Sequence, residues 1–137
     1  MEGTKKLFVS VPMRGRNDKD IDASIDKMWD IAEAVTGEKL QLIDSMIDGM
    51  APFDNRMAAV FYLGEAIKKM AEADYIITVK DAWEYAGCMI EQDVAHKYGI
   101  PVIYIDMAYV CPDVIEMDRK RRAKAVPVCE CGEVGFR

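Results

Sequence analysis

The 137-residue sequence has one histidine, four cysteines and five prolines, and it lacks a long apolar run. No stretch approaches the roughly 18 apolar residues of a transmembrane helix, so we expect no membrane span. The sequence begins with a strand pattern and has no signal-peptide architecture, which predicts a cytoplasmic protein. The formal net charge of −6 gives no support for binding to nucleic acid or to a membrane surface.

The cysteines are too few and too unevenly placed for a disulfide framework. They are Cys88, Cys111, Cys129 and Cys131. The CEC sequence at 129–131 could supply half of a metal site, but it lacks C-x-x-C spacing and the single histidine, His96, lies far away. Reduced thiols are the simpler interpretation, so we predict no metal and no cofactor.

The sequence does have a regular alternation of strand and helix signals. Short apolar runs predict strands at residues 5–12, 40–46, 74–80 and 101–107. Apolar residues at helical spacing predict helices between them, the first beginning at Asn17 or Asp18 and ending at Gly37. This order predicts right-handed crossovers and a mostly parallel sheet with strand order 2-1-3-4. We therefore expect a three-layer Rossmann-like or flavodoxin-like α/β fold.

The length suits one domain, which we place at residues 1–110, followed by a C-terminal extension at 111–137. The extension contains a possible short helix and a basic RKRRAK run. A solvated helix face is the simplest interpretation of that run, and a phosphate or partner contact is the alternative.

Ligands of open parallel sheets bind where the strand order reverses, which is here between the first and third strands. The loop after the first predicted strand reads PMRGRND, with Gly15 between Arg14 and Arg16 just before a helix. Glycine permits close backbone approach, and guanidinium groups beside free N–H groups suit an anion. An ordinary surface turn is the alternative. The loop is neither a Walker loop nor a G-x-G-x-x-G motif.

Glu91 interrupts the apolar stripe of the helix predicted after the third strand. At 100° per residue the stripe comprises Gly87, Ile90, Glu91, Val94, Ala95 and Tyr98. A carboxylate that faces the sheet must be paired, be neutralised or border a cavity, because isolated burial is costly. The alternative is a solvent-facing glutamate that interacts favourably with the helix N-terminus.

Three motifs together resemble the nucleoside 2-deoxyribosyltransferase superfamily, which includes the deoxynucleoside 5′-monophosphate N-glycosidases. They are P-M-R-G, A-D-Y-I-I-T-V and W-E-x-x-G-C-x-I-E-x-x-x-A-x-x-Y-G-I-P-V. The combination is most similar to an uncharacterised bacterial and phage branch of that superfamily. The resemblance covers roughly residues 5–106 and excludes the extension.

The resemblance implies cleavage or transfer of the N-glycosidic bond of a nucleoside or nucleotide, with Glu91 as the nucleophile. It implies that Arg14, with Gly15, helps to hold a 5′-phosphate. Arg16 is a further candidate contact because it lies next to Gly15 in the sequence. It also implies a homo-oligomer, a dimer or larger, whose sites can borrow groups from a neighbouring subunit. A non-catalytic nucleotide-binding or sensing module of the same fold is the alternative.

The sequence departs from the family pattern at catalytic positions. Phe8 stands where active relatives have a tyrosine, Val11 where they have a glycine, and Glu65 and Ala66 where an aspartate is expected. Asp81, Trp83 and Glu84 could compensate by recognising a base or ribose. Trp83 could instead cover the sheet edge. The full set of expected substrate contacts is Phe8, Ser10, Met13, Arg14, Gly15, Arg16, Asp81, Trp83, Tyr85 and Gly87.

Overall fold

The computed structural model describes residues 3–44 and 56–124. In these residues four strands form one parallel sheet with the order β2-β1-β3-β4, which confirms the predicted topology. The strands are β1 (Lys5–Ser10), β2 (Leu40–Leu42), β3 (Tyr75–Val79) and β4 (Val102–Ile105). β1 is central, with Leu7 opposite Leu42 on one side and Tyr75 on the other.

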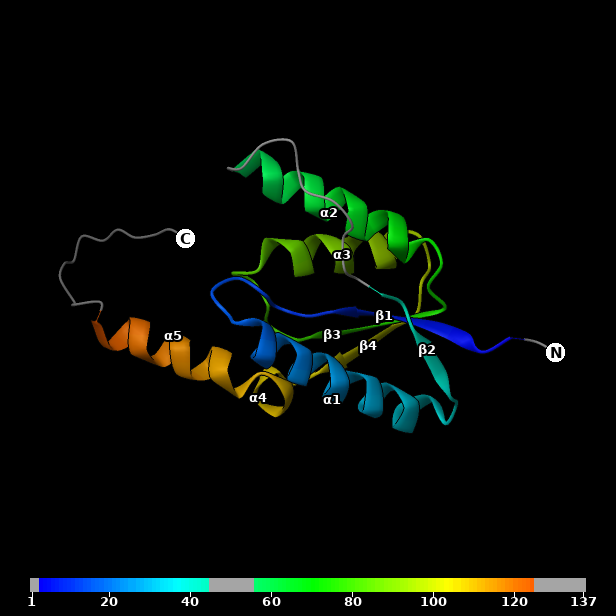
Figure 1. The fold of residues 1–137 in the computed structure, drawn as a ribbon, viewed down its shortest axis with the longest axis horizontal. Helices are drawn as coiled ribbons and strands as arrows, with labels where there is room; N and C mark the ends of the chain where they lie inside the picture. Colours follow the sequence, from blue (N-terminus) through cyan, green and yellow to red (C-terminus); the bar gives the residue numbers. More distant parts are fainter. Residues whose placement is uncertain (1–2, 45–55, 125–137) are drawn as a thin grey trace.

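Helices cover both faces of the sheet, so the predicted Rossmann-like α/β fold is confirmed (Figure 1). On one face lie α1 (Asp18–Thr36) and α4 (Met107–Val110), and on the other α2 (Arg56–Met70) and α3 (Ala86–Lys97). α5 (Pro112–Lys124) continues from α4 and extends beyond the sheet. None of the helices in the described ranges is long and apolar enough to span a membrane.

The ends of α1 follow the predicted capping signals. The side chain of Asn17 accepts a hydrogen bond from the backbone N–H of Asp20 at 2.8 Å, as an N-cap does. Gly37 has a left-handed φ of 72° and donates its N–H to the carbonyl of Glu33 at 2.9 Å. The first loop therefore passes directly from β1 into a well-defined helix N-terminus.

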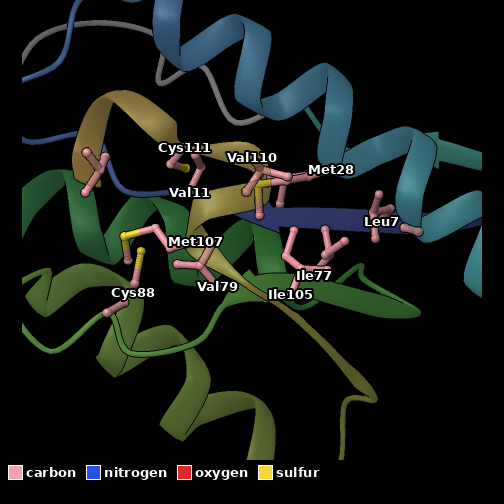
Figure 2. Packing of buried hydrophobic residues seen from close by; sticks show 14 of the residues in the cluster. Leu7, Val11, Met28, Ile77, Val79, Cys88, Ile105, Met107, Val110 and Cys111 are labelled. Atoms are coloured by element: carbon pink, nitrogen blue, oxygen red, sulfur yellow. The ribbon is translucent and has the colours of Figure 1, made fainter. Parts of the chain in front are cut away.

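Alternation along β1 divides most of the core into two clusters, one on each face of the sheet, although Cys88 of α3 also belongs to the larger one. Leu7 and Val9 join the larger cluster beneath α1, with Met28, Ile77 and Val79 (Figure 2). Phe8 joins the smaller cluster on the face of α2 and α3. The other buried members of that cluster are Ile43, Met70, Ile76 and Ala95. Ser10, two residues after Phe8, therefore faces α3.

The predicted domain boundary between residues 110 and 111 falls inside the packed core. Cys111 and Val114 are 0% and 4% exposed, and both belong to the larger cluster. The chain returns through α4 onto the face that carries α1, where Ser24 donates a hydrogen bond to the carbonyl of Val110. The first residues of the predicted extension therefore pack in this core, and residues 125–137 lie outside the described residues.

Candidate functional site

The loops that follow β1 and β3 meet at the carboxyl ends of these strands. The guanidinium carbon of Arg14 lies over the ring of Tyr85, 5.2 Å from its centroid. Tyr85 is the residue directly before α3. Arg14 is exposed and forms no salt bridge within the described part of the chain. Its charge is therefore available beside the N-terminus of α3.

Ser10 and Glu91 form a buried hydrogen bond between β1 and α3. The Ser10 hydroxyl donates to Oε1 of Glu91 at 2.6 Å. The two residues are 1% and 9% exposed. The predicted carboxylate therefore faces the sheet at its switch point, and its partner is neutral rather than cationic.

The environment of Glu91 favours the protonated acid. Burial raises the pKa of Glu91 to about 7, and the hydrogen bond from Ser10 opposes this rise. Both protonation states are consequently populated near neutral pH. A carboxyl group of this kind is suited to proton transfer, and its ionised form is suited to nucleophilic attack.

Further polar side chains lie close by on the same face. Gln92 donates from Nε2 to Oγ1 of Thr78 and to the carbonyl of Val79, both at 3.2 Å. Burial raises the pKa of the Cys88 thiol to about 12, while a hydrogen bond with Ser10 opposes the rise. Cys88 therefore remains a thiol at neutral pH and is not a candidate nucleophile.

The buried face of α3 differs from the predicted stripe. Ile90 and Tyr98 are 41% and 79% exposed, whereas Cys88 is buried and Gln92 is half-buried. The fully buried residues of α3, Cys88, Glu91 and Ala95, are thus centred roughly 60° about the helix axis from the predicted stripe. Tertiary contacts explain the rotation, because Cys88 packs in the cluster of Met107 and Gln92 bonds to the end of β3. Glu91 lies inside both stripes.

The positions that depart from the family pattern provide no polar group to Glu91. Phe8 is 2% exposed and is part of the smaller cluster, against which Ala66 also packs. The neighbouring Glu65 pairs with Lys68 at 3.1 Å. Of the other predicted contacts, Met13 is exposed and Gly87 is half-buried.

The guanidinium of Arg16, which was predicted to contact the substrate, is surrounded by acceptors of the protein itself. Its side chain is 0% exposed, and Nε and Nη2 donate to the two carboxylate oxygens of Asp113 at 2.7 and 2.9 Å. The remaining donors bind the carbonyls of Pro12 and Asp20, the hydroxyl of Ser24 and the sulfur of Cys111. Since these protein acceptors occupy the guanidinium, Arg16 fastens the β1 loop to α1 and α5.

Gly15 adopts the left-handed conformation that a turn between two arginines suggests, with a φ of +76°. A Cβ at this position would lie 3.1 Å from Cε of Met117 in α5. The close approach predicted for Gly15 is therefore to α5, in the segment that was assigned to the extension.

A cavity of about 230 Å³ lies between the β3–α3 loop and α5. Asp81, Trp83 and Tyr85, three of the predicted contacts, line it together with residues of α5, but Glu91 and Ser10 do not. The cavity was not predicted because one of its walls belongs to a helix that the sequence placed outside the domain. Tyr85 lines the cavity and also contacts Arg14.

Comparisons of the chain with protein-family models, with curated proteins and with solved structures gave no significant match. Within residues 3–44 and 56–124, no group of three or more His, Cys, Asp or Glu side chains is arranged to hold a metal ion. Cys129 and Cys131 lie outside these ranges. His96 instead stacks on Tyr104, with Nε2 and the phenol oxygen within hydrogen-bond distance.

Proposed function

We propose that the protein cleaves or transfers the N-glycosidic bond of a nucleoside or nucleotide, with Glu91 as the nucleophile. The observation that carries this proposal is the buried Glu91 carboxyl group, bonded to Ser10 and with a pKa of about 7. It lies at the switch point of a parallel sheet, where ligands of such folds bind. The motif resemblance around Glu91 supports the same assignment.

The chemistry uses the ionised form of Glu91. Ser10 binds Oε1, and Oε2 attacks the anomeric carbon as the base departs. A covalent glycosyl intermediate forms, and water or a second base then releases the sugar with overall retention. The positive charge that develops on the sugar in the transition state favours the ionised form of Glu91.

Arg14 is the candidate ligand of a 5′-phosphate. It is exposed, it has no carboxylate partner in the described residues, and the Tyr85 ring beneath it restricts its position. Tyr85 and Glu91 are six residues apart, about 9 Å along a helix axis. This arrangement allows one nucleotide to reach both groups, and it favours monophosphates over free nucleosides.

A nucleotide-binding module without turnover is the second candidate. It is favoured by Phe8 and Ala66, which occupy the places of a hydroxyl and a carboxylate in active relatives. Without a general acid the base must depart poorly protonated, which lowers the rate by roughly 10²–10⁴-fold. Such a protein would bind nucleotides and release little or no base.

Release of free base from a panel of nucleosides and 5′-monophosphates, followed by chromatography, tests the first candidate. We expect base release by the parent protein and by Asp93→Asn, an exposed carboxylate variant of α3 outside the site, and none by Glu91→Gln. Arg14→Ala should reduce the release from monophosphates more than that from nucleosides. Base release that persists in Glu91→Gln would refute the nucleophile, and tight binding without release would favour the second candidate.

The same resemblance supports a homo-oligomer, and a nucleotide substrate is consistent with the cytoplasmic location that the sequence predicts. Light scattering coupled to size-exclusion chromatography measures the oligomeric state directly. A particle with the 15.5 kDa mass of one chain would contradict this part of the proposal.

A further inference from the structure

The cavity beside α5 has an apolar floor and an aromatic wall. Met107 and Val114 are 8% and 4% exposed, whereas Trp83 is 74% exposed. A tryptophan indole has a large apolar surface, and its solvation by water rather than by protein is unfavourable. Trp83 is therefore positioned to stack on a ligand that enters the cavity.

The size of the cavity limits its occupant to one ring system. A protein cavity of about 150 Å³ accepts a benzene molecule, and pockets for drug-sized ligands begin near 300 Å³. At about 230 Å³, this cavity suits a single ring or two fused rings, not a whole nucleotide.

Ion pairs account for part of the charge around the cavity. Arg121 forms a salt bridge with Glu84, with an N–O distance of 2.6 Å, and a second one with Asp118. Asp118 also pairs with Arg122 at 3.2 Å. The Arg121–Glu84 pair joins α5 to the β3–α3 loop, whereas the two pairs with Asp118 lie within α5.

Three further charged residues line the cavity without an ion-pair partner within the described ranges. Asp81 and Asp106 form no salt bridge there, and neither does Lys80. The cavity lining therefore contains two carboxylates and one ammonium group that are not in the ion pairs described above. The lining therefore favours a ligand with hydrogen-bond donors over an anion.

We propose that this cavity binds a planar aromatic ring bearing an amino group, stacked on Trp83 and donating hydrogen bonds to Asp81 and Asp106. Glu91 does not line the cavity, although Tyr85, which contacts Arg14, does. Met107, at the floor, packs with Cys88 in the core, so the cavity ends on apolar side chains (Figure 2). The proposal stands whether or not Glu91 is catalytic.

The two tryptophans allow a direct binding test. Trp29 donates its indole N–H to the carbonyl of Leu40 at 2.9 Å, whereas Trp83 is exposed at the cavity. Titration with adenine should quench the emission of Trp83, and the Trp83→Phe protein, which keeps Trp29, should not respond. Purine has the same two rings without the amino group, and it should bind at least roughly tenfold more weakly.

Variants at the cavity test the assigned contacts by calorimetry. Trp83→Ala should weaken adenine binding roughly five- to hundredfold. Asp106→Ala should weaken it roughly tenfold, and its fold should persist because Asp106 makes no capping bond to α4. Asp81→Asn should also weaken adenine binding, because it removes a negative charge. Asparagine tolerates the left-handed φ of 57° at this position, so the backbone should not change.

Two control variants make the result decisive. Asp93→Asn removes an exposed carboxylate of α3 that pairs with Lys97, and it should leave adenine binding unchanged. Glu91→Gln should also leave it unchanged. Equal affinity for adenine and purine, or binding that survives Trp83→Ala, would overturn the proposal. Loss of binding in Glu91→Gln would show that adenine occupies the Glu91 site instead.

Discussion

Glu91 is buried, and its hydrogen-bond donor in the described part of the chain is the neutral hydroxyl of Ser10. Burial and this donor together determine how ionisation of Glu91 changes the stability of the protein. A nearby cation would stabilise the carboxylate, but desolvation is the dominant influence on its pKa and Ser10 is the opposing one. Ionisation of Glu91 therefore has a cost in folding free energy.

The pH dependence of stability should reveal this cost. The pKa of Glu91 rises from an ordinary 4.5 to about 7, so the native state holds a proton that the unfolded chain loses. The contribution of Glu91 to stability is thus fully present below pH 4.5 and falls as the pH rises to about 7. The loss is about 3 kcal/mol.

Glu91→Gln isolates this contribution, because glutamine can still accept the bond from Ser10 but does not ionise. Denaturant unfolding of both proteins between pH 4.5 and 8 should show the variant gaining stability relative to the parent across the window. A stability difference that does not change with pH would contradict a buried, titrating Glu91.

Ser10→Ala should shift the titration itself. The Ser10 hydroxyl stabilises the carboxylate, so its removal raises the pKa of Glu91 above about 7. Carbon-13 NMR of the Glu91 carboxyl group measures this pKa directly. If base release is observed, its pH profile should move to higher pH by the same amount. An unchanged or lower pKa in the variant would show that Ser10 has no such influence.

At the scale of elements, the β1 loop is held by Arg16. One buried guanidinium connects this loop to Asp113 of α5 and to Ser24 of α1. The two arginines of the loop thus have different roles: Arg16 fixes the loop, and Arg14 remains at the surface above Tyr85.

Arg16→Ala should destabilise the protein by about 3 kcal/mol, because it leaves a carboxylate and several buried acceptors without a donor. Arg16→Lys should restore little of this loss, since lysine cannot form the two-pronged contact with Asp113. Arg14→Ala, two positions earlier, is the matched control and should change the unfolding free energy by less than about 0.5 kcal/mol. Equal effects at the two positions would refute the distinction.

The order and type of the main elements could be predicted from the sequence because each has its own local signal. Gly37, for example, ends α1 through a backbone conformation that its residue type already suggests. The orientation of α3 could not be predicted, because Met107 and the end of β3 determine which side of the helix is buried. Helix periodicity alone does not contain those contacts.

For the molecule as a whole, α5 is a structural component of the domain and not an appendage. Val114 is buried in the larger cluster, whereas its neighbour Ile115 is 45% exposed. Val114→Ala should lower the unfolding free energy by roughly 1–3 kcal/mol, and Ile115→Ala should lower it much less, although it removes more atoms. Chemical denaturation compares the two, and the reverse order would argue that α5 is not packed as described.

The sequence predicts two geometric features of the candidate site. The meeting of the two loops follows from strand order, and the burial of Glu91 follows from its place on α3. The ion pair of Arg16 with Asp113 and the cavity beside Trp83 were not predicted, because both depend on α5. No signal in the first 110 residues indicates that a later helix returns to the β1 loop.

The position of β1 at the centre of a parallel sheet also has a consequence for how the chain folds. Lys6 and Asp74 exchange hydrogen bonds across 68 sequence positions, because β1 and β3 are neighbours in space but distant in the chain. Parallel pairing of this kind requires closure of a long loop before its contacts form, which slows folding. During synthesis on the ribosome, β1 must therefore wait for β3 to emerge before its backbone N–H and C=O groups are paired on both edges of the strand.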